Sequence, residues 1–315
     1  MRIVFISSSE YGCPALVSLA KDPLYKPVLV ISQPDRPAGR KLKLSPSPIS
    51  LLAEELGLPM LKPERISEPA FVAELATYSP ELLITASYGE ILGKSVRNLA
   101  PLGAINLHPS LLPRHRGATP IQSALRAGDE LTGITIFRLS PRMDAGPILR
   151  QDTVPILPGE NYSSLHDRLA VLSADYLIDF LNDLSSGKIT PQEQDDSLAS
   201  YTHKIEKQDQ LINWQDSAYN ILCHIRSLSF SPGAYQYLDD LQIKFLAAEL
   251  SPEPSSGAPG TIAQMIRNIG FTVNTGDQQV LIRQVQPAGK KIMDSWAFSL
   301  GSRISTGTKD RKSVV

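Results

Sequence analysis

Strand-length apolar runs alternate with helical patterns through the first half of this 315-residue chain. The runs that we expect as strands are MRIVFI at the N-terminus, PVLVIS near residue 30, ELLITAS near 84, GAINLH near 105 and GITIFRL near 135. Helical patterns between them cover residues 13–21, 49–57 and 119–127. This alternation is typical of βαβ units, whose strands form a sheet covered on both faces. We therefore predict an α/β fold with a Rossmann-like, mostly parallel sheet.

A second, smaller domain is expected in the C-terminal part. A helical pattern ends at Gly187, a polar connector follows, and several short strand patterns separated by turn residues begin near residue 231. Short strands of this kind indicate a small antiparallel barrel. The expected division is a catalytic domain at 1–188, a linker at 189–208 and a barrel domain at 209–315.

Composition describes an ordinary folded protein, with 42% hydrophobic and 20% charged residues. The N-terminus lacks the features of a secretory signal, and no apolar run approaches the length that spans a bilayer. We therefore expect a cytoplasmic protein that does not bind membranes. Cys13 and Cys223 lie far apart in the chain, which disfavours a disulfide. We expect no metal, because His166, His203 and His224 offer no pair at metal-ligand spacing.

Asn106 and His108 stand two residues apart at the end of one predicted strand, and Asp144 follows the next. Side chains at i and i+2 share one face of a strand, and ligands bind beyond the carboxyl ends of parallel strands. An amide, an imidazole and a carboxylate should therefore converge on one pocket. Asn106 and His108 could hold an oxyanion while Asp144 orients the imidazole and moves protons, which suits direct acyl transfer. The alternative is that these are turn and capping residues.

The segment from Gln33 to Pro48, QPDRPAGRKLKLSPSP, is expected to be a loop with little regular structure. Its positive side chains could contact the phosphates of a nucleic acid, although most short charge runs are simply solvated. The basic residues are Arg36, Arg40, Lys41 and Lys43. The first predicted βα turn, ISSSEYGCPAL, carries no G-x-G-x-x-G, which disfavours a dinucleotide cofactor, and a P-loop motif is also absent.

The segment HPSLLP, followed by RG, P and later D-x-G, resembles the signature of enzymes that transfer formyl groups from 10-formyltetrahydrofolate. PDRPAGR, KIEKQDQLINW and QPAGKKIM resemble segments of the methionyl-tRNA formyltransferases, in the same order along nearly the whole chain. The chain departs from that family's pattern in three places: Ser7–Ser9 replace a Gly-Thr-Pro sequence, His115 an aromatic residue and Ser231 a tryptophan.

The resemblance implies an enzyme that formylates the α-amino group of methionyl-initiator tRNA for translation initiation. We also expect the protein to be a monomer. The resemblance further implies an OB-like C-terminal domain that lies along the tRNA, and it places the basic loop, with Arg40, at the end of the acceptor stem. It also implies a folate site at residues 110–113, whose apolar side chains could wall the folate while backbone groups meet its polar edge. The residues of that segment are Ser110, Leu111, Leu112 and Pro113.

In the expected mechanism, the amine of methionine attacks the formyl carbon on nitrogen 10 of the folate. Asn106 and a protonated His108 hold the oxyanion, while Asp144 keeps His108 charged and assists proton transfer. Other acceptors are a nucleotide-sugar amine or glycinamide ribonucleotide, and hydrolysis of formylfolate is a further alternative. A non-catalytic tRNA-binding protein and a scaffold protein are alternatives of other classes.

The uneven distribution of charge along the chain favours tRNA over a small molecule as the acceptor. From Arg283 onward the sequence has seven basic residues and only two acidic ones, Asp294 and Asp310, whereas the whole chain has a net charge of −1. The basic residues of this stretch are Arg283, Lys290, Lys291, Arg303, Lys309, Arg311 and Lys312.

Overall fold

The structure is a computed structural model that describes the chain except for residues 39–42, 239–240, 303, 305 and 308–315. Its residues form two compact units. Unit 1 comprises residues 1–120, 131–155 and 166–203, and unit 2 comprises residues 121–130, 156–165 and 204–315. The segment that we expected as a linker, 189–208, lies across this division, because its residues up to His203 belong to unit 1.

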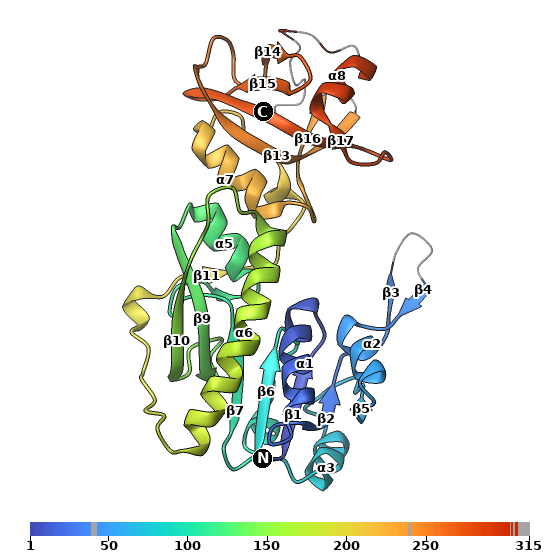
Figure 1. Ribbon diagram of the computed structural model, residues 1–315, viewed down its shortest axis with the longest axis vertical. Coiled ribbons are helices and arrows are strands. Elements are labelled where there is room, and N and C mark those ends of the chain that lie inside the picture. Colours follow the sequence, from blue (N-terminus) through green and yellow to red (C-terminus); the bar gives the residue numbers. More distant parts are fainter. Residues whose placement is uncertain (39–42, 239–240, 303, 305, 308–315) are drawn as a thin grey trace. The chain divides into compact units, whose positions relative to one another are not determined.

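A seven-stranded sheet in the order β10-β9-β7-β6-β1-β2-β5 forms the centre of unit 1 (Figure 1). The strands from β7 to β5 pair in parallel, whereas β9 is antiparallel to β7 and β10 is antiparallel to β9. The strands are β1 (Ile3–Ser7), β2 (Pro27–Ile31), β5 (Met60–Leu61), β6 (Leu82–Ala86), β7 (Ala104–His108), β9 (Leu131–Arg138) and β10 (Ile148–Pro155). The predicted α/β class is confirmed, and β10 is a strand that the sequence did not indicate.

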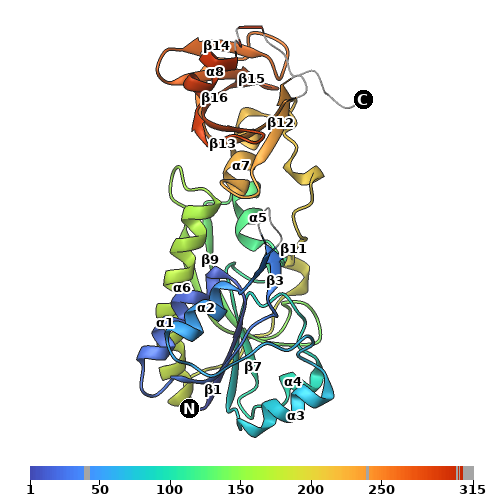
Figure 2. The same cartoon turned by 90° about the vertical axis from the view of Figure 1, so that its right-hand side faces the viewer.

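Helices cover both faces of this sheet. Figure 2 shows α1 (Cys13–Lys21), α2 (Pro48–Glu55) and α6 (Tyr162–Ser185) on one side, and α3 (Pro69–Thr77) and α4 (Lys94–Arg97) on the other. On the α3 side, alternate residues of β1 and β2 pack against apolar residues of α3 and α4 in one core cluster. Because both faces are covered, the central strands are continuous apolar runs, with all five residues of β1 and of β6 buried.

The basic segment 33–48, which we expected to be a loop with little regular structure, contains a small hairpin, so that expectation was wrong for its two short strands. β3 (Arg36–Ala38) pairs antiparallel with β4 (Lys43–Ser45). An isolated two-stranded hairpin has no central strand, so Pro37 can occupy it without breaking a ladder on both sides. The composition of the segment gave no indication of these strands, because proline and charged residues are generally depleted in strands.

Unit 2 is built on an antiparallel sheet, which confirms the β class predicted for the C-terminal part. Its strands follow the order β12-β13-β16-β15-β14, and β17 pairs with β16. Their bounds are β12 (Ala234–Leu238), β13 (Leu241–Pro254), β14 (Ile262–Ile266), β15 (Gly270–Asn274), β16 (Gln278–Pro287) and β17 (Met293–Asp294). The core between the sheet and its helices contains Trp214, Ile221, Phe245 and Phe298.

The remaining elements connect and cover these sheets. In unit 2, α7 (Ala218–Leu228) and α8 (Ser295–Ser302) contribute to the core, and α5 (Pro120–Ala127) belongs to this unit from Ile121 onward. Two short strands of unit 1, β8 (Arg116–Gly117) and β11 (Tyr201–Thr202), form a sheet of their own. Short 3₁₀ turns are η1 (Glu10–Gly12), η2 (Asp196–Leu198) and η3 (Gln208–Gln210).

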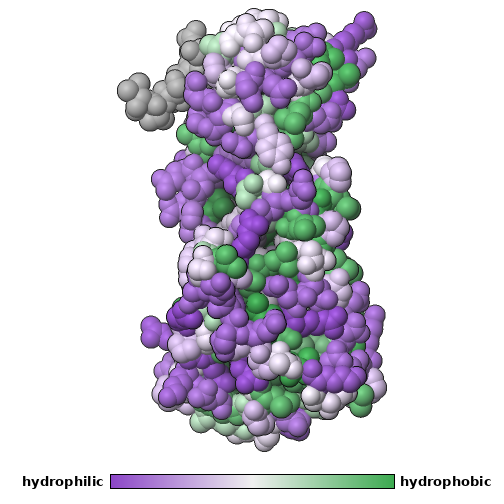
Figure 3. Space-filling view, turned by 90° about the vertical axis from the view of Figure 1, so that its left-hand side faces the viewer, coloured by the Kyte–Doolittle hydropathy of each residue, from purple (hydrophilic) through white to green (hydrophobic). Residues whose placement is uncertain are grey.

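Within the described part of the chain, every helix is too short or too polar to cross a membrane. Figure 3 shows a face on which hydrophobic residues form small groups among hydrophilic ones. Scattered apolar residues of this kind are usual on a protein surface.

Candidate active site

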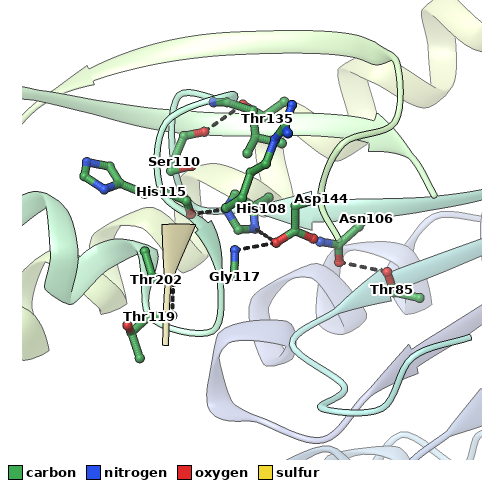
Figure 4. A network of polar contacts seen from close by, with 12 residues as sticks. Thr85, Asn106, His108, Ser110, His115, Gly117, Thr119, Thr135, Asp144 and Thr202 are labelled. Atoms are coloured by element: carbon green, nitrogen blue, oxygen red, sulfur yellow. Dashed lines mark hydrogen bonds and ion pairs between the residues drawn. The ribbon is translucent and has the colours of Figure 1, made fainter. Parts of the chain in front are cut away.

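The three predicted site residues come together at the carboxyl end of β7 (Figure 4). Asn106 and His108 lie on this strand, and Nδ1 of His108 is 3.8 Å from Oδ2 of Asp144. Asp144 belongs to the loop between β9 and β10, and β9 lies beside β7 in the sheet. The spacing of Asn106 and His108 therefore produces the convergence that the i and i+2 rule predicts.

Asn106 is oriented by a residue that the sequence did not indicate. The hydroxyl of Thr85, on β6, lies 2.8 Å from Oδ1 of Asn106 and 3.0 Å from the carbonyl oxygen of Ile105. In this arrangement the Thr85 hydroxyl donates to the amide oxygen of Asn106, so this oxygen lies on the side of Thr85. The Nδ2 group of Asn106 remains as the donor for a ligand. Thr85 lies inside an apolar run, so no local pattern marks it.

His108 is buried, and its Nε2 lies 3.1 Å from the backbone carbonyl oxygen of His115. Because a carbonyl only accepts, Nε2 carries the proton and Nδ1 faces Asp144. Burial lowers the pKa of His108 from its usual value, although the Asp144 carboxylate and the His115 carbonyl act in the opposite direction. The direction of this shift favours a neutral His108 in the free protein, whereas the expected mechanism uses a protonated one at the oxyanion. Figure 4 shows the imidazole of His115 pointing away from the His108 ring.

Asp144 is held in a defined position by the backbone of the RG motif. Its Oδ2 accepts a hydrogen bond of 2.7 Å from the amide of Gly117. Asp144 has a positive φ of 49°, an unusual conformation that aspartate tolerates better than most residues. Its side chain is 16% exposed, so it is accessible to a substrate, whereas that of His108 is only 5% exposed.

The expected folate segment is fastened to the neighbouring strands. The hydroxyl of Thr135 donates to the carbonyl oxygen of Ser110 at 2.6 Å and lies 3.2 Å from the amide of Leu112. Gln151 donates to the carbonyl oxygen of Leu112 at 2.9 Å. These backbone groups already have partners, which argues against their meeting the polar edge of a folate. The half-buried side chains of Leu111 and Pro113 remain available as apolar walls.

The connector supplies further residues that sequence reasoning missed. The side chain of Gln194 lies against the Asp144 loop and contacts Arg116, which is fully buried. β11 in the connector also pairs in parallel with β8, which contains Arg116 and Gly117. No periodicity or motif in the polar connector indicates these contacts, because they join residues that are 50 or more positions apart.

The structure places only part of the predicted tRNA-binding set. Arg36 is exposed on β3 and Lys43 begins β4, whereas Arg40 and Lys41 lie outside the described residues. In unit 2, Lys290 and Lys291 are exposed, and Arg283 lies 3.5 Å from Glu249. The other basic residues of the C-terminal stretch, Arg303, Lys309, Arg311 and Lys312, are also outside the described part.

The two cysteines are free thiols, with Cys13 half-buried and Cys223 buried. Burial raises the pKa of both thiols, which makes them poor nucleophiles. Among the described residues, His, Cys, Asp and Glu form no group of three or more that could hold a metal ion.

Comparison with known proteins identifies the family. The pattern of the family described as "Formyl transferase" matches residues 1–181, and that of "Formyl transferase, C-terminal domain" matches residues 204–303. A methionyl-tRNA formyltransferase of Syntrophus aciditrophicus is 39% identical over 308 residues, which are 98% of this chain and 98% of the relative. This chain belongs to the methionyl-tRNA formyltransferase family.

Solved structures agree with the fold of this formyltransferase. A methionyl-tRNA formyltransferase from Clostridium thermocellum superposes with a TM-score of 0.56 at 14% identity, covering 80% of this chain and 94% of that one. HypX from Aquifex aeolicus, in complex with tetrahydrofolic acid, gives 0.63 at 17% identity, with 95% of this chain matching 47% of HypX. The chain thus spans about half the length of HypX. The family resemblance seen in the sequence is confirmed.

Proposed function

We propose that this formyltransferase moves the formyl group of 10-formyltetrahydrofolate to the α-amino group of methionyl-initiator tRNA, for translation initiation. The observation that carries the proposal is the convergence of Asn106, His108 and Asp144 at the end of β7. It occurs in a chain that matches a relative with this named activity along 98% of its length. In this proposal, residues 1–188 perform the chemistry, residues 189–208 connect, and residues 209–315 bind tRNA.

The chemistry begins when the neutral amine nitrogen attacks the formyl carbon and forms a tetrahedral intermediate. Asn106 donates to the new oxyanion through Nδ2, since its amide oxygen faces Thr85. Nδ1 of His108 and the Asp144 carboxylate accept the proton that the attacking nitrogen releases. An imidazolium formed in this way stabilises the oxyanion. The proton then moves to nitrogen 10 of the folate as its bond to the carbon breaks and the C=O bond re-forms.

The neutral state of His108 in the free protein suits this sequence of steps. Because burial lowers the pKa of His108, Nδ1 has a free lone pair when the substrates bind. The imidazole gains its charge only when the intermediate needs it. The expected role of Asp144 therefore changes from keeping His108 charged to sharing the transferred proton with it.

We place the folate against Leu111 and Pro113, with Ser110 and Leu112 holding the segment in place. Leu111 packs over β9, because a Cβ atom at Gly133 would lie 2.4 Å from Leu111 Cδ2. Ser110 is buried, and its hydroxyl donates to the carbonyl of Arg114 at 2.8 Å. These contacts give the ligand a rigid wall, which reduces the entropy lost on binding.

We assign the acceptor end of the tRNA to the basic segment 33–48, through Arg36, Arg40, Lys41 and Lys43. Exposure of Arg36 supports this assignment, since a cation must be accessible to contact phosphate.

We also propose that the protein acts in the cytoplasm as a monomer. Light scattering coupled to size-exclusion chromatography should then give a mass near the 34.4 kDa of one chain.

The direct test is single-turnover formylation of methionyl-initiator tRNA by the purified protein with 10-formyltetrahydrofolate. Free methionine and a nucleotide-sugar amine serve as parallel acceptors. Transfer to the charged tRNA alone supports the proposal. Formylation of the sugar, or hydrolysis of formylfolate without transfer, would contradict the proposed acceptor and favour another reaction of the same enzyme class.

The catalytic assignment predicts large rate losses from three single substitutions. Asn106→Ala, His108→Ala and Asp144→Ala should each lower the single-turnover rate about 100- to 1000-fold, as removal of one oxyanion-hole donor typically does. Lys21→Ala, which changes an exposed residue of α1, is the control. Near-wild-type rates in the three variants would exclude these residues as the catalytic groups.

A further inference from the structure

The side chain of Gln194, in the connector, contacts the loop that carries Asp144. Its amide nitrogen donates to the carbonyl oxygen of Asp144 at 2.9 Å and to that of Gly146 at 2.7 Å. Two hydrogen bonds therefore fix the backbone on both sides of Ala145. The contact joins residues that are 50 positions apart in the sequence.

The oxygen of the same side chain is held by Arg116. Oε1 of Gln194 accepts from Nε of Arg116 at 3.1 Å and from its NH2 group at 2.8 Å. A carboxamide has two N–H donors and an oxygen with two lone pairs, so all its hydrogen-bonding positions are occupied. A group that is saturated in this way has one orientation, and the amide nitrogen must face the Asp144 loop.

Arg116 is itself immobilised. It has no exposed surface, its NH2 group lies 2.9 Å from Oδ1 of Asp196, and its NH1 group lies 3.1 Å from the hydroxyl of Tyr201. Its backbone amide donates to the carbonyl oxygen of Ser200 at 2.9 Å. The buried guanidinium is thus a fixed fork, which suits a bidentate contact. It holds the side-chain oxygen of Gln194 in one position.

These contacts act on the residue whose position matters to the chemistry. Asp144 has a positive φ, and its carboxylate is fixed from the other side by the amide of Gly117. Asp144 therefore has two anchors. Gln194 holds its backbone carbonyl, and the amide of Gly117 holds its side chain. Without the first anchor, the unusual backbone conformation would be free to relax, and the 3.8 Å separation from Nδ1 of His108 would no longer be maintained.

We propose that Gln194, held by Arg116, is a positioning residue for Asp144, so that the connector completes the active site. The proposal rests on the proposed function, because it assigns Gln194 a role in the geometry of formyl transfer. Gln194 does not touch the reacting atoms. Its effect is exerted through the backbone of Asp144.

Gln194→Glu distinguishes this role from a purely structural one. A glutamate keeps the length of the side chain and can pair with Arg116, but it has no N–H donor for the carbonyl oxygens of Asp144 and Gly146. If Gln194 only fastens the connector to Arg116, the variant should behave like the wild type. If it positions Asp144, the single-turnover rate should fall about 100-fold, as for a misplaced catalytic group, with KM for 10-formyltetrahydrofolate unchanged.

Gln192→Glu is the matched control. Gln192 lies in the same connector, its side chain is exposed, and its backbone exchanges two hydrogen bonds with Ile148. This variant adds the same charge two residues away along the connector and should keep the wild-type rate. Equal losses in the two variants would overturn the proposal, since charge in the connector would then explain both.

A second variant gives a readout that does not depend on activity. Gln194→Met keeps the volume of the side chain and adds no charge. Because Asp144 raises the pKa of His108, a displaced Asp144 should lower that pKa further, as NMR titration of the His108 ring would show. Hydrogen exchange of the Gly117 amide, which donates to Asp144, should become faster.

These NMR results separate the two possible failures. If the wild-type protein formylates no tRNA, the proposed function fails, while the titration and exchange data still decide whether Gln194 positions Asp144. Unchanged values for His108 and Gly117 in folded Gln194→Met would refute the positioning role even in an active enzyme.

Discussion

The chemistry available to Asn106 depends on a single neighbouring hydroxyl. The Thr85 hydroxyl donates to Oδ1 of Asn106, and this contact favours the orientation in which Nδ2 faces the substrate. A flipped amide would present an oxygen to the developing oxyanion and would destabilise it. The identity of residue 85 is therefore relevant to catalysis, although this residue is buried and touches no substrate in the proposed mechanism.

Thr85→Val tests this dependence, because valine has nearly the shape of threonine and lacks the hydroxyl. Loss of one hydrogen bond corresponds to about 1 kcal/mol, so the single-turnover rate should fall about fivefold to tenfold. Thr85→Ser, which keeps the donor, should retain most of the activity. Equal rates in the valine and serine variants would show that Asn106 keeps its orientation by other means.

At the scale of elements, the pairing of β8 with β11 fixes the loop around the candidate site. Tyr201 and Thr202 of β11 lie beside Arg116 and Gly117. Gly117 has φ +117°, and a Cβ atom there would lie 2.4 Å from the carbonyl oxygen of Thr202. The glycine of the RG motif is thus required by the closeness of the connector, as well as by its backbone conformation.

Gly117→Ala should therefore lower the free energy of unfolding by about 3 kcal/mol, since strain and a backbone clash add. Gly187→Ala is the control, because Gly187 also has a positive φ but no neighbour within 4 Å. It should cost only about 1 kcal/mol. Urea unfolding followed by circular dichroism measures both changes, and similar losses would contradict the clash.

The helix α7 contains a buried histidine that should make stability depend on pH. Burial and the nearby guanidinium of Arg126 lower the pKa of His224 to about 4, from 6.5. As pH falls, the unfolded chain takes up this proton first, so stability decreases from about pH 6.5 down to about pH 4. The loss attributable to His224 is up to about 3 kcal/mol.

His224→Gln isolates this effect, because glutamine can donate to the carbonyl oxygen of Asp209, as Nε2 of His224 does, but does not titrate. Its urea midpoint should fall less between pH 7 and pH 4 than that of the wild type. The same pH dependence in both proteins would assign the loss to other groups.

Elements with a local signal could be predicted from the sequence, and those formed by distant contacts could not. The apolar runs of β1, β2, β6 and β7 and the spacing of Asn106 and His108 are local, and they led to the sheet and the site geometry. The pKa of His108 depends on its burial and on Asp144, which belongs to the loop after the next strand of the sheet. Gln194 has no local signal, because its partners are remote and its neighbours are polar. The hairpin β3–β4 was hidden by its prolines and charges.

At the scale of the whole molecule, the proposed substrate is far larger than the site that reacts with it. Cationic side chains far from the active site can therefore attract the phosphates of the tRNA and contribute to its affinity. The exposed Arg36, Lys290 and Lys291 are described by the structure, whereas Arg40 and most of the C-terminal cations are outside it.

Arg40→Ala should raise KM for methionyl-initiator tRNA while leaving folate binding intact. If Arg40 contacts a phosphate, the slope of log affinity against log salt concentration should decrease by about 1. Lys21→Ala, which removes a cation from an exposed position of α1, should leave the slope unchanged. A loss of folate binding in Arg40→Ala would contradict a role confined to tRNA.

The contact between Gln194 and the Asp144 loop also has a consequence for the order in which the chain is synthesised. All the strands of the seven-stranded sheet precede residue 156, yet the side chain that anchors Asp144 is added 50 residues after Asp144 itself. A nascent chain on the ribosome can therefore form that sheet before Gln194 and β11 have left the exit tunnel. Until they emerge, the Asp144 loop lacks one of its two anchors, so the emerging protein gains its architecture before its full catalytic geometry.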